Sequence, residues 1–291
     1  MDSPITPSNR TWRALLVLGR VSNLPTVWSN CLAGWILADG GPWERFALLC
    51  LGATLIYIGG MYLNDAYDAE FDRQHRQERP IPSGVVSEQF VLRTGLAFLG
   101  IGATILIFLG SGTAWMGFLL TLSVIFYDVL HKRIDWAPLL MSICRLFLFL
   151  AAAAAGRNGI TGLAVWSAIA LAAYIIGLSY LARRESLAGP LRYWPCYLLG
   201  VPLVLAWLVN PGAYRQAFTV LSFVLGIWVI RCLYRVFWTP EPQIGRAVSG
   251  LLAGIVLVDL LAVAGPTNGM AMVFLGLFGL ALLFQRFVPA T

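Results

Sequence analysis

The densest run of polar residues in the chain, from Tyr62 to Gly84, places acidic side chains just ahead of basic ones. Asn64, Asp68 and Asp72 are four residues apart and share one face if a helix continues through them; Asp65 can join them. Carboxylates at this spacing repel unless a cation neutralises them, and oxygen ligands in a row suit Mg²⁺, which binds few carboxylates plus substrate phosphate oxygens. The basic residues that follow suit phosphate oxygens: Arg73, Arg76 and Arg79. The pattern predicts a diphosphate site; the alternative is a charged, solvated loop.

The elements that position these residues must lie in a membrane. Of the 291 residues 59% are hydrophobic and 12% are charged, and the mean hydropathy is +0.77. Soluble domains carry about a quarter charged residues. The composition therefore excludes an ordinary cytosolic enzyme, a disordered chain and a nucleic-acid-binding domain. We expect one membrane domain over 1–291, with a polar N-terminal tail at 1–11 and polar loops at 64–88 and 182–192.

Ten apolar windows are long enough to be candidate membrane helices, since a span needs about 20 residues. We expect an all-α, polytopic membrane protein with nine or ten helices. The window that contains Pro195 and Pro202 is the shortest and the least regular. The windows are 13–38, 44–63, 89–109, 113–130, 137–155, 162–181, 193–209, 216–238, 247–265 and 268–287.

The basic residues predict the orientation of these helices. Most of the 20 Lys and Arg residues lie in alternate loops on one side, whereas Arg45, Arg157 and Arg215 are on the other. The positive-inside rule places the richer side in the cytoplasm. We expect an inner (plasma) membrane protein whose N-terminus and polar loops face the cytoplasm, and the net charge of +6 then reflects topology and not nucleic-acid binding.

Three motifs resemble those of the UbiA superfamily of intramembrane prenyltransferases. The string N-D-x-x-D-x-x-x-D from Asn64 to Asp72, followed by E-R-P-I-P-S-G, resembles the family's first aspartate-rich motif. The segment Gly19–Pro25, followed by Leu-Ala-Gly, resembles its R-P-x-x-L-P segment. Tyr127 to Arg133 is similar to its Tyr…Leu-Lys-Arg segment, with one extra residue inserted.

The resemblance implies helices around a central cavity that opens to the cytoplasm and sideways to lipid, nine in the family and here with a tenth. It implies transfer of an isoprenyl group from an isoprenyl diphosphate to an aromatic or lipid-like acceptor, with Mg²⁺ as cofactor. The implied catalytic residues are Asp68, Asp72 and Lys132. The implied metal ligands are Asn64, Asp65, Asp68, Asp72 and Glu185. The implied substrate-binding residues are Arg20, Asn23, Arg76, Arg79, Tyr127, Arg133, Arg183 and Arg184.

The family's second aspartate-rich motif is missing. Where it should follow the sixth helix, the chain has Arg183, Arg184 and Glu185 and no aspartate, a divergence similar to that of the EboC-like group. The arginines could replace the second metal as phosphate clamps. Glu185 alone could hold one Mg²⁺ with water. Catalysis could also be lost, which would leave a non-catalytic isoprenyl-diphosphate-binding protein, and a membrane lipid or small-molecule transporter is a further alternative.

Three ionisable residues fall inside or beside the apolar windows. Such groups are functional candidates and usually face the protein interior. Asp128 can pair with Lys132 at the interface or belong to the site. Asp259 can pair with Arg145, or be neutral and hydrogen-bonded.

Overall fold

In the computed structural model, residues 7–186, 192–209, 215–263 and 268–290 are described, and every regular element among them is a helix. The first half contains α1 (Pro7–Leu18), the 3₁₀ helix η1 (Val21–Asn23), α2 (Leu24–Leu37), α3 (Trp43–Tyr67), α4 (Ala69–His75), α5 (Glu88–Phe108) and α6 (Ser111–Leu130). The second half contains α7 (Ala137–Ala155), α8 (Gly162–Ser186), the 3₁₀ helix η2 (Trp194–Gly200), α9 (Val201–Val209), α10 (Arg215–Phe237), α11 (Ile244–Ala262) and α12 (Asn268–Phe284). The expectation of an all-α polytopic membrane fold is confirmed.

Seven of the described helices are long and apolar enough to cross a bilayer: α3, α5, α6, α7, α8, α10 and α11. The segments Trp194–Val209 and Gly269–Phe284 form shorter apolar helices. Each of the ten predicted windows contains a helix, and the window at 193–209 is irregular as expected. Pro195 and Pro202 lie at the beginnings of η2 and α9, where a proline ring and its missing N–H are tolerated.

The expectation of one helix over 13–38 is wrong, because the chain turns sharply at Arg20. Arg20 has a φ of 41° and ψ of 48°, in the left-handed region, and separates α1 from η1 and α2. A helix that continued through Val21 would lose the hydrogen bond that Pro25 cannot donate and would clash with the proline ring. With Pro25 in the first turn of α2 the problem disappears. The turn places Arg20 and Asn23 at the end of the bundle.

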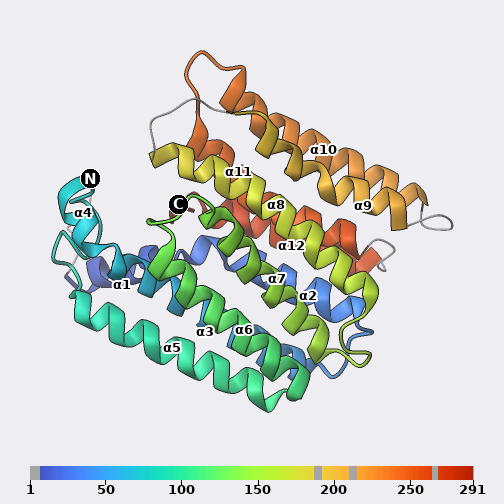
Figure 1. Cartoon of the computed structure of the whole chain (residues 1–291), viewed down its shortest axis with the longest axis horizontal. Helices are drawn as coiled ribbons and strands as arrows, with labels where there is room; N and C mark the ends of the chain where they lie inside the picture. The colour runs from blue at the N-terminus through green and yellow to red at the C-terminus, as the bar shows by residue number, and fades with distance from the viewer. Residues whose placement is uncertain (1–6, 187–191, 210–214, 264–267, 291) are drawn as a thin grey trace.

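The helices pack side by side with α5 along one edge and α10 along the opposite edge (Figure 1). One core cluster joins α2 and α7 to α8–α12, and a second joins α2 and α7 to α3, α5 and α6. The helices α2 and α7 therefore link the two halves. α11 is the most enclosed of the seven spanning helices.

Glycines allow α3 and α5 to approach closely. A Cβ atom on Gly59 would lie 2.8 Å from the carbonyl oxygen of Gly95, and one on Gly102 would lie 2.7 Å from that of Gly52. Both contacts are too short for a real side chain. Small residues at such crossings are the usual means of helix association in lipid, and here they fix the helix whose end carries the acidic residues.

A third core cluster supports that end of α3. Leu18 of α1, Ala69 of α4, and Ile81 and Val86 of the following turn are all buried together. The turn is compact because the amide groups of residues 85 and 86 donate to the carbonyl of Pro80, and Gly84 adopts a φ of 74°. The chain after α4 is therefore folded back onto α3.

Two segments that were predicted to be loops begin as helices. Within 64–88, α3 continues to Tyr67 and α4 covers Ala69–His75. Within 182–192, α8 continues to Ser186, since neither proline nor glycine precedes Gly189 there. Residues 187–191 lie outside the described part of the chain.

Candidate active site

The acidic residues form one continuous helical ladder although α3 formally ends at Tyr67. The amide of Asp68 donates to the carbonyl of Asn64 at 3.0 Å, and the amide of Asp72 donates to that of Asp68 at 2.9 Å. The amide of Arg76 continues the series to Asp72 at 2.7 Å. This i to i−4 pattern keeps the residues one turn apart on one side of the helix.

Arg79 lies between two of the acids. Its Nη1 is 3.0 Å from Asp65 Oδ1 and 3.0 Å from Asp72 Oδ2. Arg20, from the turn before α2, reaches the same Asp65 oxygen at 3.9 Å. Charge-assisted hydrogen bonds of this kind are the stronger ones in proteins. The fold-back after α4 thus returns an arginine to the acids that precede it.

Asp68 is held from the other side by the end of α6. Lys132 Nζ is 2.7 Å from Asp68 Oδ1, and His131 Nε2 is 3.5 Å from the same oxygen. Burial by itself raises the pKa of Asp68, but hydrogen bonds from His131 and Lys132 outweigh it and hold the pKa below its ordinary value. Lys132 also lies 4.1 Å from the centre of the Phe71 ring. Asp68 is therefore a carboxylate at neutral pH.

Several buried oxygens of this cluster are left without partners. Asp72 is 2% exposed, and its Oδ1 has no hydrogen-bond partner among the described residues. Asn64 donates through Nδ2 to Asp128 Oδ1 at 3.3 Å, and the second oxygen of that carboxyl is likewise unpartnered in the described chain. Buried polar atoms without partners are rare in proteins. Beside the ion pairs of this cluster, they indicate a site where a bound ligand would supply the missing partners.

The donor chemistry of this site fits Mg²⁺. Within the described part of the chain, no three His, Cys, Asp or Glu side chains converge closely enough to form a closed metal site. Mg²⁺ does not require one, because it binds through one or two carboxylates with phosphate oxygens and water completing the shell. Asp72 Oδ1 has no partner among the described residues, and the backbone ladder places Asp68 one turn and Asn64 two turns before it, so oxygen-bearing side chains of the kind that Mg²⁺ prefers follow one another along this helix.

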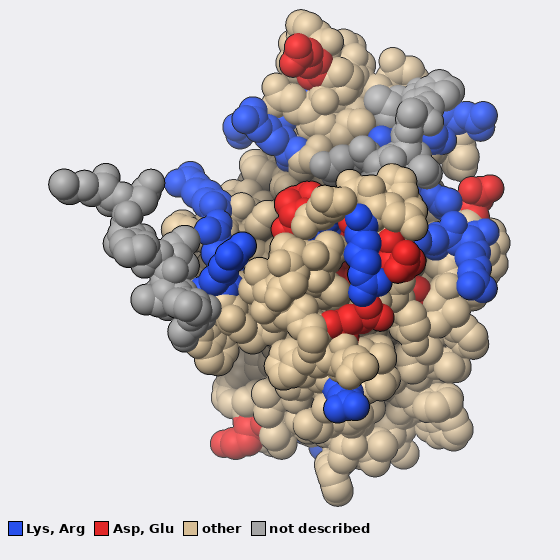
Figure 2. Space-filling model, turned by 90° about the vertical axis from the view of Figure 1, so that its left-hand side faces the viewer, with Lys and Arg blue, Asp and Glu red and all other residues tan. Residues whose placement is uncertain are grey.

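Acidic and basic side chains gather together on this end of the molecule (Figure 2). The carboxylates of Asp65, Asp68 and Asp72 each lie within 4.0 Å of a Lys or Arg nitrogen. The cluster is therefore close to electrically balanced before any ligand binds. Magnesium and a diphosphate largely cancel each other's charge, so their joint arrival preserves that balance.

Arg183 and Arg184 at the end of α8 were predicted to bind a phosphate, and in the structure both contact other parts of the protein. Arg183 Nη1 donates to the carbonyls of Ile134 and Asp135 at 2.9 and 2.8 Å, and Nη2 lies 3.3 Å from Asp135 Oδ1. Arg183 thus ties α8 to the turn that carries His131 and Lys132. The Arg184 guanidinium lies 5.4 Å from the centre of the Tyr180 ring. The side chain of Glu185 is outside the described part of the chain.

The remaining predicted residues surround the cluster at varying distances. Tyr127 stacks on His131 with 5.1 Å between ring centres, and Arg133 is exposed on the same turn. Arg76 is half-buried just after α4. Asn23 is buried, but its Nδ2 donates to the carbonyl of Ala290 at 2.9 Å, so the structure brings it to the C-terminal segment and not to the acids.

Asp259 and Arg145 belong to a second polar cluster inside the bundle. Asp259 is fully buried; its Oδ2 accepts from Ser29 Oγ at 2.5 Å and from Asn30 Nδ2 at 2.7 Å. Arg145 Nη1 donates to Asn30 Oδ1 at 2.7 Å, and Nη2 to Thr26 Oγ1 at 3.0 Å. The sequence left two alternatives for Asp259, a direct pair with Arg145 or hydrogen bonds to neutral groups. In the structure Asp259 accepts hydrogen bonds from neutral side chains, and Asn30 links it to Arg145.

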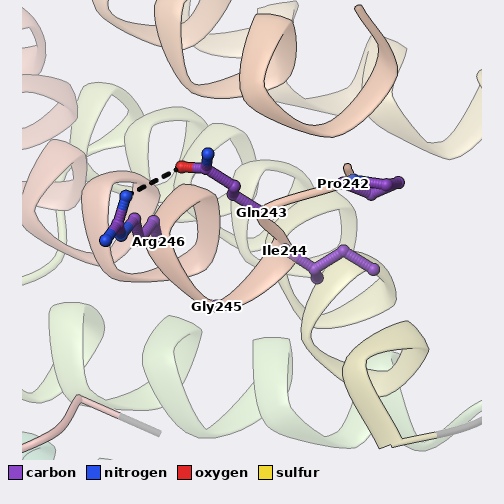
Figure 3. Close-up of a pocket in the computed structure, with 5 residues that line it drawn as sticks. All are labelled: Pro242, Gln243, Ile244, Gly245 and Arg246. Carbon is purple, nitrogen blue, oxygen red and sulfur yellow. Dashed lines mark hydrogen bonds between the residues drawn. The ribbon is translucent and has the colours of Figure 1, made fainter. Parts of the chain in front are cut away.

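A surface hollow at the turn between α10 and α11 shares no lining residue with the acidic cluster. It is lined by Pro242–Arg246, and Arg246 Nη1 donates to Gln243 Oε1 at 3.1 Å (Figure 3). It contains none of the predicted site residues.

His131 is a residue of the site that was not predicted from the sequence, and it lies against Asp68. Asp128 was given two alternatives, a pair with Lys132 or a place in the site, and among the described residues it accepts from Asn64 of the site and not from Lys132. His131 follows Tyr127 by four residues, a helical spacing that places both on the face that meets α3. That spacing is the one sequence feature that pointed to it.

Comparison with known proteins supports this description. The UbiA prenyltransferase family model matches residues 24–249. A digeranylgeranylglyceryl phosphate synthase of Sulfolobus acidocaldarius is 33% identical over 119 residues, which are 40% of this chain and 42% of that protein. The protoheme IX farnesyltransferase of Oceanobacillus iheyensis is 30% identical over 137 residues, 42% of this chain and 41% of that protein. These matches span less than half the length of each relative.

Solved structures share the fold at low sequence identity. The apo structure of a UbiA homolog from Aeropyrum pernix K1 has a TM-score of 0.67 at 14% identity and covers 84% of this chain and 97% of that one. A UbiA homolog from Archaeoglobus fulgidus bound to GPP and Mg²⁺ has a TM-score of 0.52 at 14% identity, covering 94% of this chain and 97% of that one. With the family model matching most of the chain, the protein belongs to the UbiA prenyltransferase family.

Proposed function

We propose that this protein is a Mg²⁺-dependent prenyltransferase that moves an isoprenyl group from an isoprenyl diphosphate to an aromatic or lipid-like acceptor within the membrane. The observation that carries the proposal is the cluster of Asp65, Asp68 and Asp72, in which each acid has a basic partner and buried Asp72 Oδ1 has none in the described structure. Membership of the family and the names of the relatives support the reaction class.

The reaction breaks the allylic C–O bond, and its electron pair leaves with the diphosphate. The acceptor then forms a bond to the allylic carbon and loses a proton. Asn64, Asp68 and Asp72, with Asp65 beside them, would hold Mg²⁺, which when bound supplies positive charge to the departing oxygens. Glu185 stays a proposed ligand for a second ion. Since no residue of the chain bonds covalently to the substrate in this scheme, catalysis is electrostatic and positional.

We propose that Arg79 and Lys132 bind the diphosphate. Arg79 already donates to Asp65 and Asp72 at 3.0 Å, and Lys132 Nζ lies 2.7 Å from Asp68, so both point toward the acids before a ligand binds. Donors that are oriented in advance stabilise developing negative charge without reorganising during the reaction. We propose four further contacts to the diphosphate: Arg20, Arg76, Arg133 and Arg184. Tyr127 and Asn23 are proposed as substrate-binding residues beside the acids. Arg183 is proposed as a contact to the diphosphate that also acts through the turn at Ile134.

The membrane provides the second requirement of the chemistry. An allylic cation is quenched by water, so it must form in an apolar pocket. We propose that the isoprenyl tail lies between helices, in a cavity that opens from the acidic end. The excess of basic residues at that end supports a cytoplasmic orientation in the inner membrane.

The test is turnover by the purified protein with Mg²⁺, a radiolabelled isoprenyl diphosphate and a panel of acceptors: an aromatic acid, a quinol precursor, a porphyrin and a glyceryl phosphate ether. We expect pyrophosphate release and a prenylated product with one acceptor class, both abolished by EDTA. Magnesium-dependent binding without product from any acceptor would indicate a non-catalytic binder. Movement of intact diphosphate across vesicles without bond cleavage would indicate a transporter.

A further inference from the structure

Asp128 is a buried carboxyl that the reaction scheme does not use. It lies near the end of α6, is 3% exposed, and its Oδ1 accepts a hydrogen bond from Asn64 Nδ2 at 3.3 Å. Its Oδ2 has no partner among the described residues. Lys132, one helical turn further on, pairs instead with Asp68. A buried acid with this arrangement needs an explanation other than an interfacial ion pair.

The contact with Asp128 determines which end of the Asn64 amide faces the site. An asparagine amide presents an oxygen that accepts and a nitrogen that only donates, and the two ends are nearly identical in shape. A nitrogen cannot ligate a cation. When Nδ2 donates to Asp128, the oxygen is turned away from Asp128, on a residue one turn before Asp68 in the acidic ladder.

We propose that Asp128 is a positioning residue that fixes the amide of Asn64 with its oxygen available to the cation and the diphosphate. The inference rests on the proposed function. Outer carboxyl groups that orient a ligand commonly affect metal affinity or activity by about 10- to 100-fold. Asp128 acts through Asn64, because the one hydrogen bond that its carboxyl makes among the described residues comes from the Asn64 amide.

The geometry also explains why the orientation needs fixing. Asn64 is 6% exposed, so water cannot easily satisfy whichever end is turned inward. Without an acceptor at residue 128, the nitrogen has no fixed partner, and the amide can present either end to the site. A carboxyl held on a neighbouring helix removes that ambiguity and links α6 to α3.

The test compares Asp128→Ala and Asp128→Asn with the wild type and with Ser123→Ala. Ser123 is buried on the same helix and donates to the carbonyl of Leu119, so its loss removes a polar group without touching the acids. The first readout is the affinity for Mn²⁺, measured by electron paramagnetic resonance in the presence of geranyl S-thiolodiphosphate. The second is the thermal unfolding midpoint.

We expect Asp128→Ala to weaken Mn²⁺ binding by about ten-fold or more, and Ser123→Ala to leave it unchanged. Asp128→Asn keeps an acceptor oxygen but allows either amide orientation, so we expect a loss of only about two-fold. Equal Mn²⁺ affinity in all four proteins would overturn the proposal. A purely structural role would lower the unfolding midpoint without this order of affinities, and would overturn it too.

Failure of the proposed function looks different. In that case the wild type itself binds no Mn²⁺ with the analogue, or binds it equally well after Asp72→Ala. If the wild type shows binding that depends on Asp72 but not on residue 128, only the role of Asp128 is wrong. If Asp128→Ala does not fold, the comparison of Asp128→Asn with Ser123→Ala decides the question alone.

Discussion

In the described part of the chain, two clusters of buried carboxyl and basic side chains connect their charges in different ways. At the end of α3, Asp65, Asp68 and Asp72 contact Arg79 and Lys132 directly. Between α2, α7 and α11, the described residues that donate to Asp259 are the neutral Ser29 and Asn30, and Arg145 reaches it through the Asn30 side chain. The two clusters contain similar types of side chain, but in the first the charged groups contact each other directly and in the second a neutral side chain lies between them.

The difference indicates what each cluster is for. Both clusters contain a buried carboxylate oxygen without a partner among the described residues, Asp72 Oδ1 in the first and Asp259 Oδ1 in the second. Only the first has direct ion pairs at an end of the bundle, and these can exchange their partners for a metal and an anion. A fully buried acid that is held by neutral donors joins three helices and is difficult to rearrange, since each broken hydrogen bond leaves a buried polar group. We therefore expect the first cluster to control activity and the second to control stability.

The largest effect should come from removing an acid of the first cluster. We expect Asp68→Ala or Asp72→Ala to lower pyrophosphate release by about 10³-fold, since the loss of charge stabilisation at a leaving group has effects of this order. The unfolding midpoint should fall less than it does in Asp259→Ala. Glu70→Ala is the matched control, because Glu70 is exposed on α4 and pairs with the exposed Arg73. Equal turnover in all of these proteins would refute the comparison.

Arg79→Gln should have the next largest effect. It removes the donor shared by Asp65 and Asp72, and we expect the KM for the isoprenyl diphosphate to rise by about 10- to 100-fold, the equivalent of one charged hydrogen bond. Arg93→Gln, on the exposed side of α5, serves as the control. A loss in kcat at constant KM would mean that Arg79 acts in the transition state alone.

Asp259→Ala should separate the two clusters. It leaves Ser29 and Asn30 without their acceptor, and we expect the free energy of unfolding in detergent to fall by about 1–3 kcal/mol. The KM and kcat of the protein that remains folded should be close to those of the wild type, and Asp259→Asn should restore part of the stability. A stable Asp259→Ala protein without activity would place this cluster in the reaction.

Arg183→Gln should have a smaller effect on the first cluster. The substitution removes the hydrogen bonds from Arg183 to the carbonyls of Ile134 and Asp135, so the turn that carries Lys132 is held less firmly. We expect the KM for the isoprenyl diphosphate to rise about three-fold, which is well below the effect of losing one charged hydrogen bond. Arg246→Gln is the control, because the hydrogen bond of the Arg246 side chain within the described structure is a local one, to Gln243. A rise as large as that of Arg79→Gln would show that the direct contact of Arg183 with the diphosphate matters more than its hydrogen bonds to the turn.

The smallest effect should be the pH dependence of stability through Asp68. Its pKa is lower in the folded protein than its ordinary value, so the folded state favours the carboxylate. The stabilisation is complete above the ordinary pKa and is lost as the pH falls through the lowered one. We expect Asp68→Asn to reduce the decline of the unfolding midpoint between neutral and strongly acidic pH. Identical profiles would mean that the pair with Lys132 is not formed.

Much of the fold could be predicted from the sequence because lipid imposes a simple rule on length and hydrophobicity. All ten windows contain helices, although the break at Arg20 required knowing how Pro25 starts a new helix. The acids of the candidate site were identifiable from their four-residue spacing.

The partners of those acids could not be predicted, because they come from distant parts of the chain. Arg79 returns to Asp65 only through the turn at Pro80–Gly84, and Asp128 meets Asn64 only when α6 packs against α3. Arg183 stands where the family has an acid, and no spacing indicates that it binds the turn at Ile134. Pairings of this kind depend on tertiary packing and not on local pattern.

The measurement that tests the central claim most directly is binding of geranyl S-thiolodiphosphate by titration calorimetry, with Mg²⁺ or with EDTA, for the wild type and Asp72→Ala. Asp72 provides the buried oxygen without a partner in the described structure. We expect binding that requires Mg²⁺ in the wild type and is lost in a folded Asp72→Ala protein. Binding that persists in EDTA, or that is equal in both proteins, would contradict the assignment of the acidic cluster as a magnesium–diphosphate site.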